Sequence, residues 1–293
     1  MNKEQLMARL EEIGAEGPKR SLGQNFLISE FIIDSIIKAV QRNPTQEVIE
    51  IGPGLGSLTD QLLQLKLPLT LLELDQKFVA YWRTRLAEPL LSSAAVRVLE
   101  GDALQMDWQK LFQKETALLV SNLPYQISSS LLIDRSLEPG RLSAMILMFQ
   151  KEVAQRISAS ERSKEYGLLT VIAQNFWNID LLCECSPRDY YPAPNVASRV
   201  LVFKIKKDQV IPLALRGEFL KFIKAGFAHR RKRLFNNLKG QYFSSRNQPE
   251  ELLQQGFAHL QLGASARAEE LSPSVFRDLF LFCNQAVPSV RID

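Results

Sequence analysis

The sequence alternates short apolar runs with segments of helical periodicity, and this alternation constrains the fold more than any other feature. The apolar runs predict strands at residues 48–51, 69–72, 96–99, 117–120 and 143–149. Helical spacing is found at residues 1–12, 31–39, 58–65 and 76–87. Short runs that are almost entirely apolar are typical of strands buried on both faces, as in parallel sheets covered by helices. We therefore predict an α/β fold with a parallel sheet.

Residues able to bind a ligand follow the ends of four of these strands. Gly52 follows the first strand and Glu73 the second, while Asp102 and Asn122 follow the next two. In an open α/β sheet, ligands bind outside the carboxyl ends of the strands. We expect these four residues to share one site at that edge of the sheet.

A glycine-rich turn, Gly52-Pro53-Gly54-Leu55-Gly56, separates the first strand from a helix. Glycine permits a tight turn and lets the backbone approach a ligand closely. The dinucleotide fingerprint would require glycine at position 57, where the chain has Ser57, and the turn lacks the Gly-Lys-Ser/Thr of a phosphate loop. The turn therefore favours a ligand with an uncharged linkage over one with a pyrophosphate.

Two acids complete the predicted ligand site. Glu73 lies 21 residues after Gly52 and is placed to accept hydrogen bonds from ribose hydroxyls. Asp102 is placed to meet an adenine amine. Each residue alone could belong to an ordinary strand–helix turn or cap a helix. Their order and spacing favour an adenosine-containing cofactor, and S-adenosylmethionine is the best match.

The tetrapeptide Asn122-Leu123-Pro124-Tyr125 follows the fourth strand and suits an adenine substrate. The N6 amine of adenine is a poor nucleophile because its lone pair is delocalised into the ring. Carbonyl acceptors from the Asn122 side chain and the Leu123 backbone would favour a pyramidal nitrogen. Pro124 stiffens the turn, and Tyr125 offers a face on which a flipped base can stack. Taken alone, the peptide could also be a strand end followed by a proline turn.

Composition narrows the class of protein and of site. Three cysteines without a CxxC pair and two distant histidines argue against a metal site and a disulfide framework. Methyl transfer from a sulfonium depends on orientation, so we expect no metal. The amino-terminal segment has no apolar core of a signal peptide, and no apolar run approaches 18 residues. We therefore expect a cytoplasmic protein without a membrane partner.

Several motifs resemble those of the ribosomal RNA adenine N6,N6-dimethyltransferase family. They lie, in order, at residues 22–27, 50–56, 73–75, 101–103, 122–125, 150–154, 166–168 and 192–196. The resemblance covers nearly the whole chain. It implies a Rossmann-like, S-adenosylmethionine-dependent methyltransferase sheet with a small helical carboxyl-terminal domain.

The resemblance also implies roles for individual residues. It implies cofactor contacts for Asn25, Leu27, Gly52, Glu73, Asp102 and Asn122, and contacts with the target base for Asn122 and Tyr125. Tyr190 takes the position of the family's aromatic residue that helps to sandwich the adenine. Ala197 stands where the family often has an aspartate, which puts any role of that acid in doubt here.

The alternation of strand and helix patterns ends after about residue 207, and helical segments dominate beyond it. They lie at residues 214–227, 230–238, 249–255 and 273–284. We predict a catalytic domain over 1–207 and a helical RNA-binding domain over 208–293. Residues 221–239 contain no acid and supply the candidate RNA-binding residues Lys221, Lys224, Arg230, Arg231, Lys232 and Arg233. Such charge could belong to a solvated helix face, but the resemblance favours contacts with RNA phosphates.

The resemblance implies a substrate as well. It is a pair of adjacent adenosines near the 3′ end of 16S rRNA, within the 30S subunit or its precursor. We expect the enzyme to be a monomer. Two alternatives stay open at this point. One is a large-subunit rRNA dimethylase of the macrolide-resistance type, and the other is a non-catalytic RNA-binding assembly factor.

Overall fold

The computed structural model describes residues 3–15, 17–18, 24–87, 95–208, 210–244 and 250–285. The chain forms two compact units. The first comprises Met1–Arg135, Pro139–Ala154 and Asn178–Ile205, and the second comprises Ser136–Glu138, Gln155–Trp177 and Lys206–Asp293. The second unit resumes close to the predicted boundary after residue 207. It also includes Gln155–Trp177, because the apolar helix α7 (Leu168–Phe176) packs against two helices of this unit.

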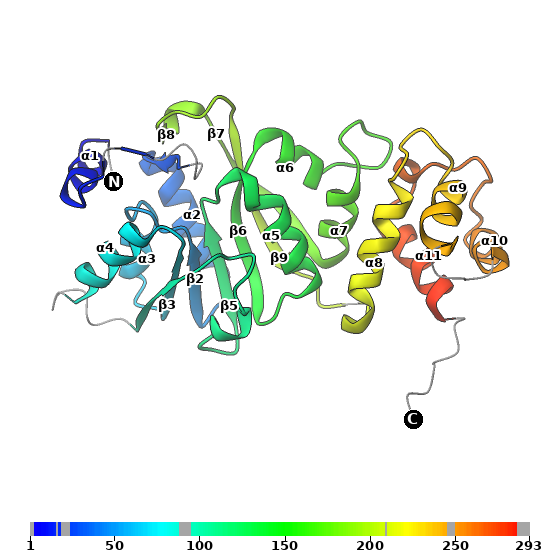
Figure 1. Cartoon of the computed structure of the whole chain (residues 1–293), viewed down its shortest axis with the longest axis horizontal. Helices are drawn as coiled ribbons and strands as arrows, with labels where there is room; N and C mark the ends of the chain where they lie inside the picture. The colour runs from blue at the N-terminus through cyan, green and yellow to red at the C-terminus, as the bar shows by residue number, and fades with distance from the viewer. Residues whose placement is uncertain are drawn as a thin grey trace. The chain divides into compact units, whose positions relative to one another are not determined.

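The first unit contains a seven-stranded sheet in the order β4-β3-β2-β5-β6-β9-β7 (Figure 1). The strands are β2 (Glu47–Ile51), β3 (Leu69–Glu73), β4 (Val96–Glu100), β5 (Ala117–Ser121), β6 (Leu142–Gln150), β7 (Trp177–Cys185) and β9 (Ser198–Ile205). Every residue of β2, β3 and β5 is buried, including the acids of β2 and Glu73 of β3. The five strands predicted from the sequence pair in parallel, whereas β9 runs antiparallel to β6. The predicted parallel sheet is thus confirmed for these five strands.

The order in which strands are added to the sheet reverses at β2, because β3 and β4 lie on one side of it and β5 lies on the other. From β2 the chain passes to β3 and then to β4, and it returns to pair β5 with the free side of β2. A crevice opens at the carboxyl ends of the strands where such a reversal occurs. Gly52 and Asn122 lie on the two sides of this reversal.

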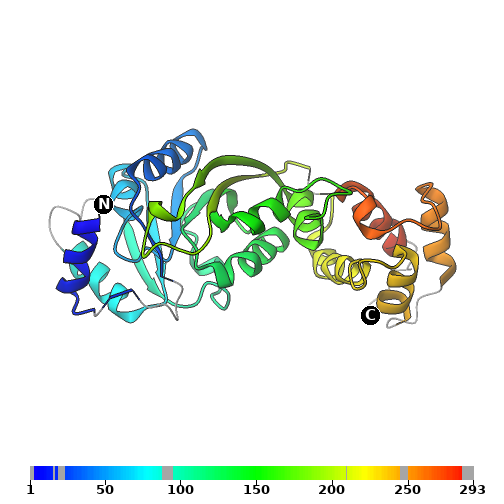
Figure 2. The same cartoon turned by 90° about the horizontal axis from the view of Figure 1, so that it is seen from above.

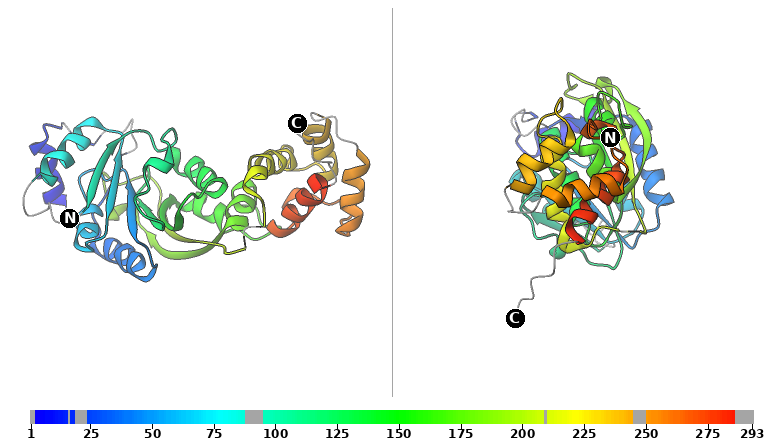
Figure 3. Two further views of the ribbon diagram at one scale, coloured as in Figure 1. Left: turned by 90° about the horizontal axis from the view of Figure 1, so that it is seen from below. Right: turned by 90° about the vertical axis from the view of Figure 1, so that its right-hand side faces the viewer.

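Helices α1 (Lys3–Glu12), α2 (Glu30–Arg42), α3 (Thr59–Gln64) and α4 (Gln76–Leu86) contribute to one core with the sheet. Alternate sheet residues, including Val48, Leu118 and Ile146, enter this core because successive side chains of a strand point to opposite faces. Helix α2 runs along the sheet in Figure 2 and in the left view of Figure 3. The helices predicted at 31–39, 58–65 and 76–87 are therefore confirmed.

A short ribbon joins two segments that are far apart in the sequence. Strand β1 (Phe26–Leu27) pairs antiparallel with β8 (Tyr190–Tyr191), so that Leu27 lies opposite Tyr190. Helix α5 (Tyr125–Leu137) follows β5, and α6 (Lys151–Ile157) follows β6. Neither β1 nor β8 was predicted, because two residues are too few to show an apolar period. Leu22 and Gly23 of the first motif lie outside the described residues.

The second unit is helical, as predicted. With α7 it contains α8 (Leu213–Gly226), α9 (Leu234–Leu238), α10 (Glu250–His259) and α11 (Pro273–Gln285), which gather together in the right view of Figure 3. Its core is aromatic, and the ring of Phe280 meets Phe219 and Phe222 edge-on at 5.2 and 5.5 Å between centroids. Within the part of the chain that the structure describes, no helix combines the length and apolarity needed to cross a bilayer.

The predicted helix at 230–238 is wrong in its first half. Residues 227–233 form turns, and α9 begins only at Leu234. The run from His229 to Arg233 is polar throughout and offers no apolar stripe to bury. The Asn237 side chain instead donates to the carbonyls of Gly226 and His229 and thereby stabilises the turns. The candidate residues Arg230 to Arg233 therefore lie in a loop.

The glycine turn after β2 generates the first prediction. Gly56 has a φ of +94°, and a Cβ added there would lie 2.8 Å from the Trp82 indole. Trp82 is fully buried and its Nε1 donates to the Gly54 carbonyl at 2.8 Å, so the ring cannot easily withdraw. We expect Gly56→Ala to lower the free energy of unfolding by about 1–3 kcal/mol, measured by denaturant titration.

Gly217→Ala is the matched control. Gly217 lies in α8, and nothing would lie within 4 Å of its added Cβ. This change should raise the free energy of unfolding by roughly 0.5–1 kcal/mol, because alanine suits a helix interior better than glycine. Unfolding of Gly56→Ala at the wild-type midpoint would show that the turn is not strained as described.

Candidate functional site

A cavity of about 210 Å³ lies at the carboxyl edge of the sheet. Its walls come from the segments that follow β2, β3, β4 and β5, from residues 24–27 and from α4. The predicted site residues that line it are Asn25, Leu27, Gly52, Glu73, Asp102, Asn122, Leu123 and Tyr125. The structure thus brings together all predicted cofactor residues and all predicted target-base residues except Tyr190.

The Glu73 carboxylate joins β3 to the glycine turn. Its Oε2 accepts a hydrogen bond from the Gly54 amide at 3.1 Å, and its Oε1 accepts from the amides of Leu74 and Asp75 at 2.8 and 2.9 Å. Burial raises the pKa of Glu73, and the three backbone donors oppose that rise. A carboxylate has about four acceptor positions, so three amides leave capacity for a ligand hydroxyl.

Asp102 is held in place by the turn that follows β4. One carboxylate oxygen accepts from the Leu104 amide at 2.9 Å, and the other accepts from the Gln105 side chain at 2.9 Å. The side chain is half-buried and lines the cavity. Asp102 therefore offers an oriented acceptor of the kind that an exocyclic amine requires.

Asn122 has its side-chain amide oriented by a long-range contact. Its Nδ2 donates to the Asn25 carbonyl at 2.9 Å, which ties the end of β5 to the segment before β1. This bond identifies Nδ2 as the edge that faces Asn25 and leaves Oδ1 as the acceptor edge. Among the described residues, no group donates to Oδ1. Asn122 can therefore present a carbonyl oxygen to a ligand in the cavity.

Tyr125 lines two adjoining hollows. Its ring borders the cavity and also a second hollow, whose other walls include Gln150 and residues 192–196. Its hydroxyl lies 2.7 Å from the Ser198 Oγ, and burial raises the pKa of the phenol. The ring is thus anchored at its polar end. Ser198 was not predicted as a partner of Tyr125, although it directly follows Ala197, the position at which the chain departs from the family pattern.

Tyr190 lies in the core and not in the walls of either hollow. Its side chain is only 3% exposed, and its hydroxyl donates to the Met148 sulfur at 3.1 Å. Its backbone pairs with Leu27, which does line the cavity, so Tyr190 connects the cavity-lining residues 24–27 to residues 192–196. Its predicted stacking on the target base stays a prediction.

Glu50 is a buried acid in the cavity wall that sequence reasoning did not single out. It is 2% exposed and accepts a hydrogen bond from the Thr59 hydroxyl at 2.7 Å. Burial raises its pKa from 4.5 to about 8. An acid within the otherwise apolar strand at 48–51 was the available signal, because an isolated acid in a buried strand needs a compensating partner.

The predicted RNA-binding residues fall into two groups within the second unit. Arg231, Lys232 and Arg233 are exposed and line a hollow of about 440 Å³ together with Asn237. Arg230 instead contacts its own unit: its Nε lies 2.7 Å from the Glu269 carboxylate, and its Nη2 donates to the carbonyls of Ser163 and Lys164. The remaining two residues lie on α8, where Lys221 pairs with Glu218 at 2.9 Å and Lys224 is exposed. The loop is therefore the better candidate for phosphate contacts.

A family model described as Ribosomal RNA adenine dimethylase matches residues 16–284. The chain belongs to this family. It is 46% identical over 274 residues to the Ribosomal RNA small subunit methyltransferase A of Bdellovibrio bacteriovorus, covering 94% of this chain and 95% of the relative. A protein of the same name from Syntrophotalea carbinolica is 38% identical, covering 76% of this chain and 82% of the relative. The predicted enzyme class, an rRNA adenine dimethyltransferase, is thus confirmed through the family.

Solved structures confirm the predicted fold. A dimethyladenosine transferase from Plasmodium falciparum has a TM-score of 0.73 at 24% identity, covering 89% of this chain and 98% of the other. The 23S rRNA methyltransferase ErmE has a TM-score of 0.63 at 22% identity, covering 89% of this chain and all of the other. The methyltransferase sheet and the carboxyl-terminal helices are therefore shared.

Glu50 generates a prediction about pH. The folded protein holds the Glu50 proton up to a pKa of about 8, whereas the unfolded chain releases it near 4.5. Between these values the folded state binds more protons, so the free energy of unfolding falls as pH rises. Glu50→Gln stays neutral at every pH and should remove this part of the decline. One pKa unit corresponds to about 1.4 kcal/mol. The free energy of unfolding of the variant should therefore rise relative to that of the wild type by a few kcal/mol between pH 5 and about 8.

Denaturant titrations of both proteins at several pH values measure this difference. The comparison isolates Glu50, because the other buried acids are common to both proteins. Parallel pH profiles for the wild type and Glu50→Gln would contradict the assignment of a raised pKa to Glu50.

Proposed function

We propose that this chain transfers methyl groups from S-adenosylmethionine to N6 of two adjacent adenosines near the 3′ end of 16S rRNA. The product is N6,N6-dimethyladenosine, and the reaction serves small-subunit biogenesis. The observation that carries the proposal is the Asn122 amide, whose nitrogen is bound to Asn25 and whose oxygen is the acceptor edge beside the cavity. It lies in the same cavity wall as the two acids that suit an adenosine cofactor.

The cavity residues fit S-adenosylmethionine. Glu73 can accept from ribose hydroxyls, and Asp102 can accept from the cofactor's adenine amine. At Gly52, whose φ is +65°, an added Cβ would meet nothing within 4 Å, so the backbone borders open space there. The bound cofactor would supply a methyl group on a sulfonium. No metal is part of the proposed reaction.

The chain's own residues orient the nucleophile. The Asn122 Oδ1 and the Leu123 carbonyl accept hydrogen bonds from the N–H groups of the target amine, which favours a pyramidal nitrogen with an available lone pair. The Tyr125 ring stacks on the flipped base, and its hydroxyl contact with Ser198 restricts its motion. Holding the nitrogen in line with the methyl group is a proximity effect and needs no general base at the transfer step.

Phosphate contacts are assigned to the basic loop of the second unit. Arg231, Lys232 and Arg233 are exposed, and Lys221 and Lys224 of α8 add positive charge in the same unit. Folded RNA is recognised largely by shape and backbone, which suits such a surface. The proposed partner is 16S rRNA in the 30S subunit or its precursor, bound by a monomer in the cytoplasm.

A large-subunit substrate is the main alternative. The chain is 22% identical to ErmE, a 23S rRNA methyltransferase. It is 46% identical to the relative from Bdellovibrio bacteriovorus, which is named for the small subunit. This difference favours the small subunit. Primer extension across both rRNAs, after reaction with undermethylated 30S and 50S particles, separates the two. Stops in 16S rRNA alone support the proposal, and stops in 23S rRNA alone refute it.

A non-catalytic assembly factor is the other alternative, and Asn122 provides the test. We expect Asn122→Ala to lower kcat for methyl transfer on the order of 10²-fold, because an oriented polar group at the reacting atom is lost. Binding to 30S particles, measured by filter retention, should not change. Asn178→Ala removes an exposed asparagine of β7 and serves as the control. Full activity in Asn122→Ala would refute the proposed role of the amide.

The basic loop generates a prediction about salt. Arg231→Ala should weaken 30S binding and reduce the slope of log K against log salt by about 1, because one phosphate contact is lost. Arg230→Ala should lower thermal stability and leave the slope unchanged, since Arg230 contacts Glu269 and two carbonyls of its own unit. Equal slopes for the wild type and Arg231→Ala would remove the loop from the RNA interface.

A further inference from the structure

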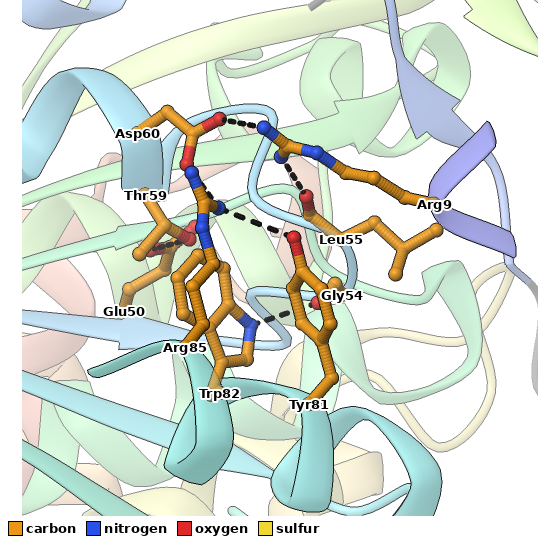
Figure 4. Close-up of polar contacts among 9 residues, drawn as sticks. All are labelled: Arg9, Glu50, Gly54, Leu55, Thr59, Asp60, Tyr81, Trp82 and Arg85. Carbon is orange, nitrogen blue, oxygen red and sulfur yellow. Dashed lines mark hydrogen bonds and ion pairs between the residues drawn. The ribbon is translucent and has the colours of Figure 1, made fainter. Parts of the chain in front are cut away.

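Helix α1 contacts the outer side of the glycine turn through one arginine. The Arg9 Nη1 donates to the Leu55 carbonyl at 2.6 Å, and its Nη2 lies 2.7 Å from the Asp60 carboxylate (Figure 4). Leu6 and Leu10 of the same helix are buried in the core and hold α1 against the first unit. Arg9 does not line the cavity. It therefore contacts the turn from outside the ligand site.

A second arginine completes this network from α4. The Arg85 Nη1 lies 2.6 Å from the other oxygen of Asp60 and also donates to the Tyr81 hydroxyl at 3.2 Å. Figure 4 shows the guanidinium groups of Arg9 and Arg85 converging on the one carboxylate. Asp60, in the first turn of α3, thus joins α1 to α4 behind the turn.

The peptide groups of the turn are held on both sides. On the outer side, the carbonyls of Gly54 and Leu55 accept from Trp82 and Arg9. On the cavity side, the Gly54 amide donates to Glu73 at 3.1 Å. A free glycine-rich turn has many conformations, and a ligand that fixes them loses affinity through the lost entropy. Contacts that fix the turn beforehand reduce that cost.

We infer that Arg9 is a positioning residue for the cofactor, acting through the glycine turn. Because its side chain does not line the cavity, it would act on the cofactor without touching it. Its bidentate guanidinium fixes the Leu55 carbonyl relative to Asp60, so the turn is ordered before the cofactor binds. The inference rests on the proposed function only in taking the cavity for the cofactor site.

The test compares Arg9→Ala with Arg9→Lys and with Arg83→Ala. A lysine can reach one of the two partners but cannot bridge both with a planar fork. Arg83 lies exposed on α4, so its removal changes the net charge equally without touching the turn. Hydrogen exchange of the protein without cofactor reports the order of the turn through the amides of Gly56 and Asp60, which bond to the carbonyls of Pro53 and Gly56.

In Arg9→Ala we expect these two amides to exchange about tenfold faster, while the amides of β5 exchange as in the wild type. The Kd for S-adenosylhomocysteine, by calorimetry, and the KM for S-adenosylmethionine should both rise about tenfold, with kcat and the KM for 30S particles unchanged. Arg9→Lys should recover part of the loss, and Arg83→Ala should behave as the wild type.

Unchanged exchange in Arg9→Ala would overturn the inference, as would a fall in kcat with cofactor affinity unaffected. A lower melting temperature of Arg9→Ala together with faster exchange in β5 would also overturn it, since Arg9 would then stabilise the whole unit. A wild type that does not bind S-adenosylhomocysteine would refute the proposed function instead. The exchange measurement would still decide whether Arg9 orders the turn.

Discussion

The Glu73 carboxylate is the interaction on which the rest of the site depends. It accepts hydrogen bonds from three backbone amides and thereby joins the end of β3 to the turn after β2. Burying an acid is unfavourable, and its raised pKa reflects that cost. The amides offset the cost and place the carboxylate in the cavity wall. One side chain therefore shapes the turn and, in the proposed function, offers acceptors to the ribose of the cofactor.

The order of the strands supplies the second requirement, a meeting point for two substrates. Strand β5 pairs with the side of β2 that faces away from β3. The glycine turn after β2 and Asn122 after β5 therefore lie next to each other at the same edge of the sheet. Asn122 bonds to Asn25, just before β1, and β1 pairs with β8. These contacts connect residues 25–27 to residues 192–196. The proposed cofactor and base sites thus share walls, which suits a reaction that depends on alignment more than on acid–base chemistry.

Local patterns predicted the parallel strands and the cavity residues Gly52, Glu73, Asp102 and Asn122 that follow them, whereas Asn25 and Leu27 were predicted from the family resemblance. Apolar runs mark the strands, and the carboxyl ends of parallel strands necessarily share one edge. The contacts of Arg9, the burial of Tyr190 and the two-residue ribbon were not predicted, since each depends on residues far apart in the chain. Residues 230–233 were wrongly predicted to be helical together with 234–238, because the prediction did not require an apolar stripe, which these four residues lack.

The most direct measurement of the central claim is the mass spectrum of nucleosides from rRNA after reaction of this protein and S-adenosylmethionine with undermethylated 30S particles. We expect N6,N6-dimethyladenosine at two residues per 16S rRNA, because the role proposed for the Asn122 oxygen is to orient an adenine amine, and this amine can accept two methyl groups. A digest without dimethyladenosine, or with the methyl groups on another atom or base, would contradict it.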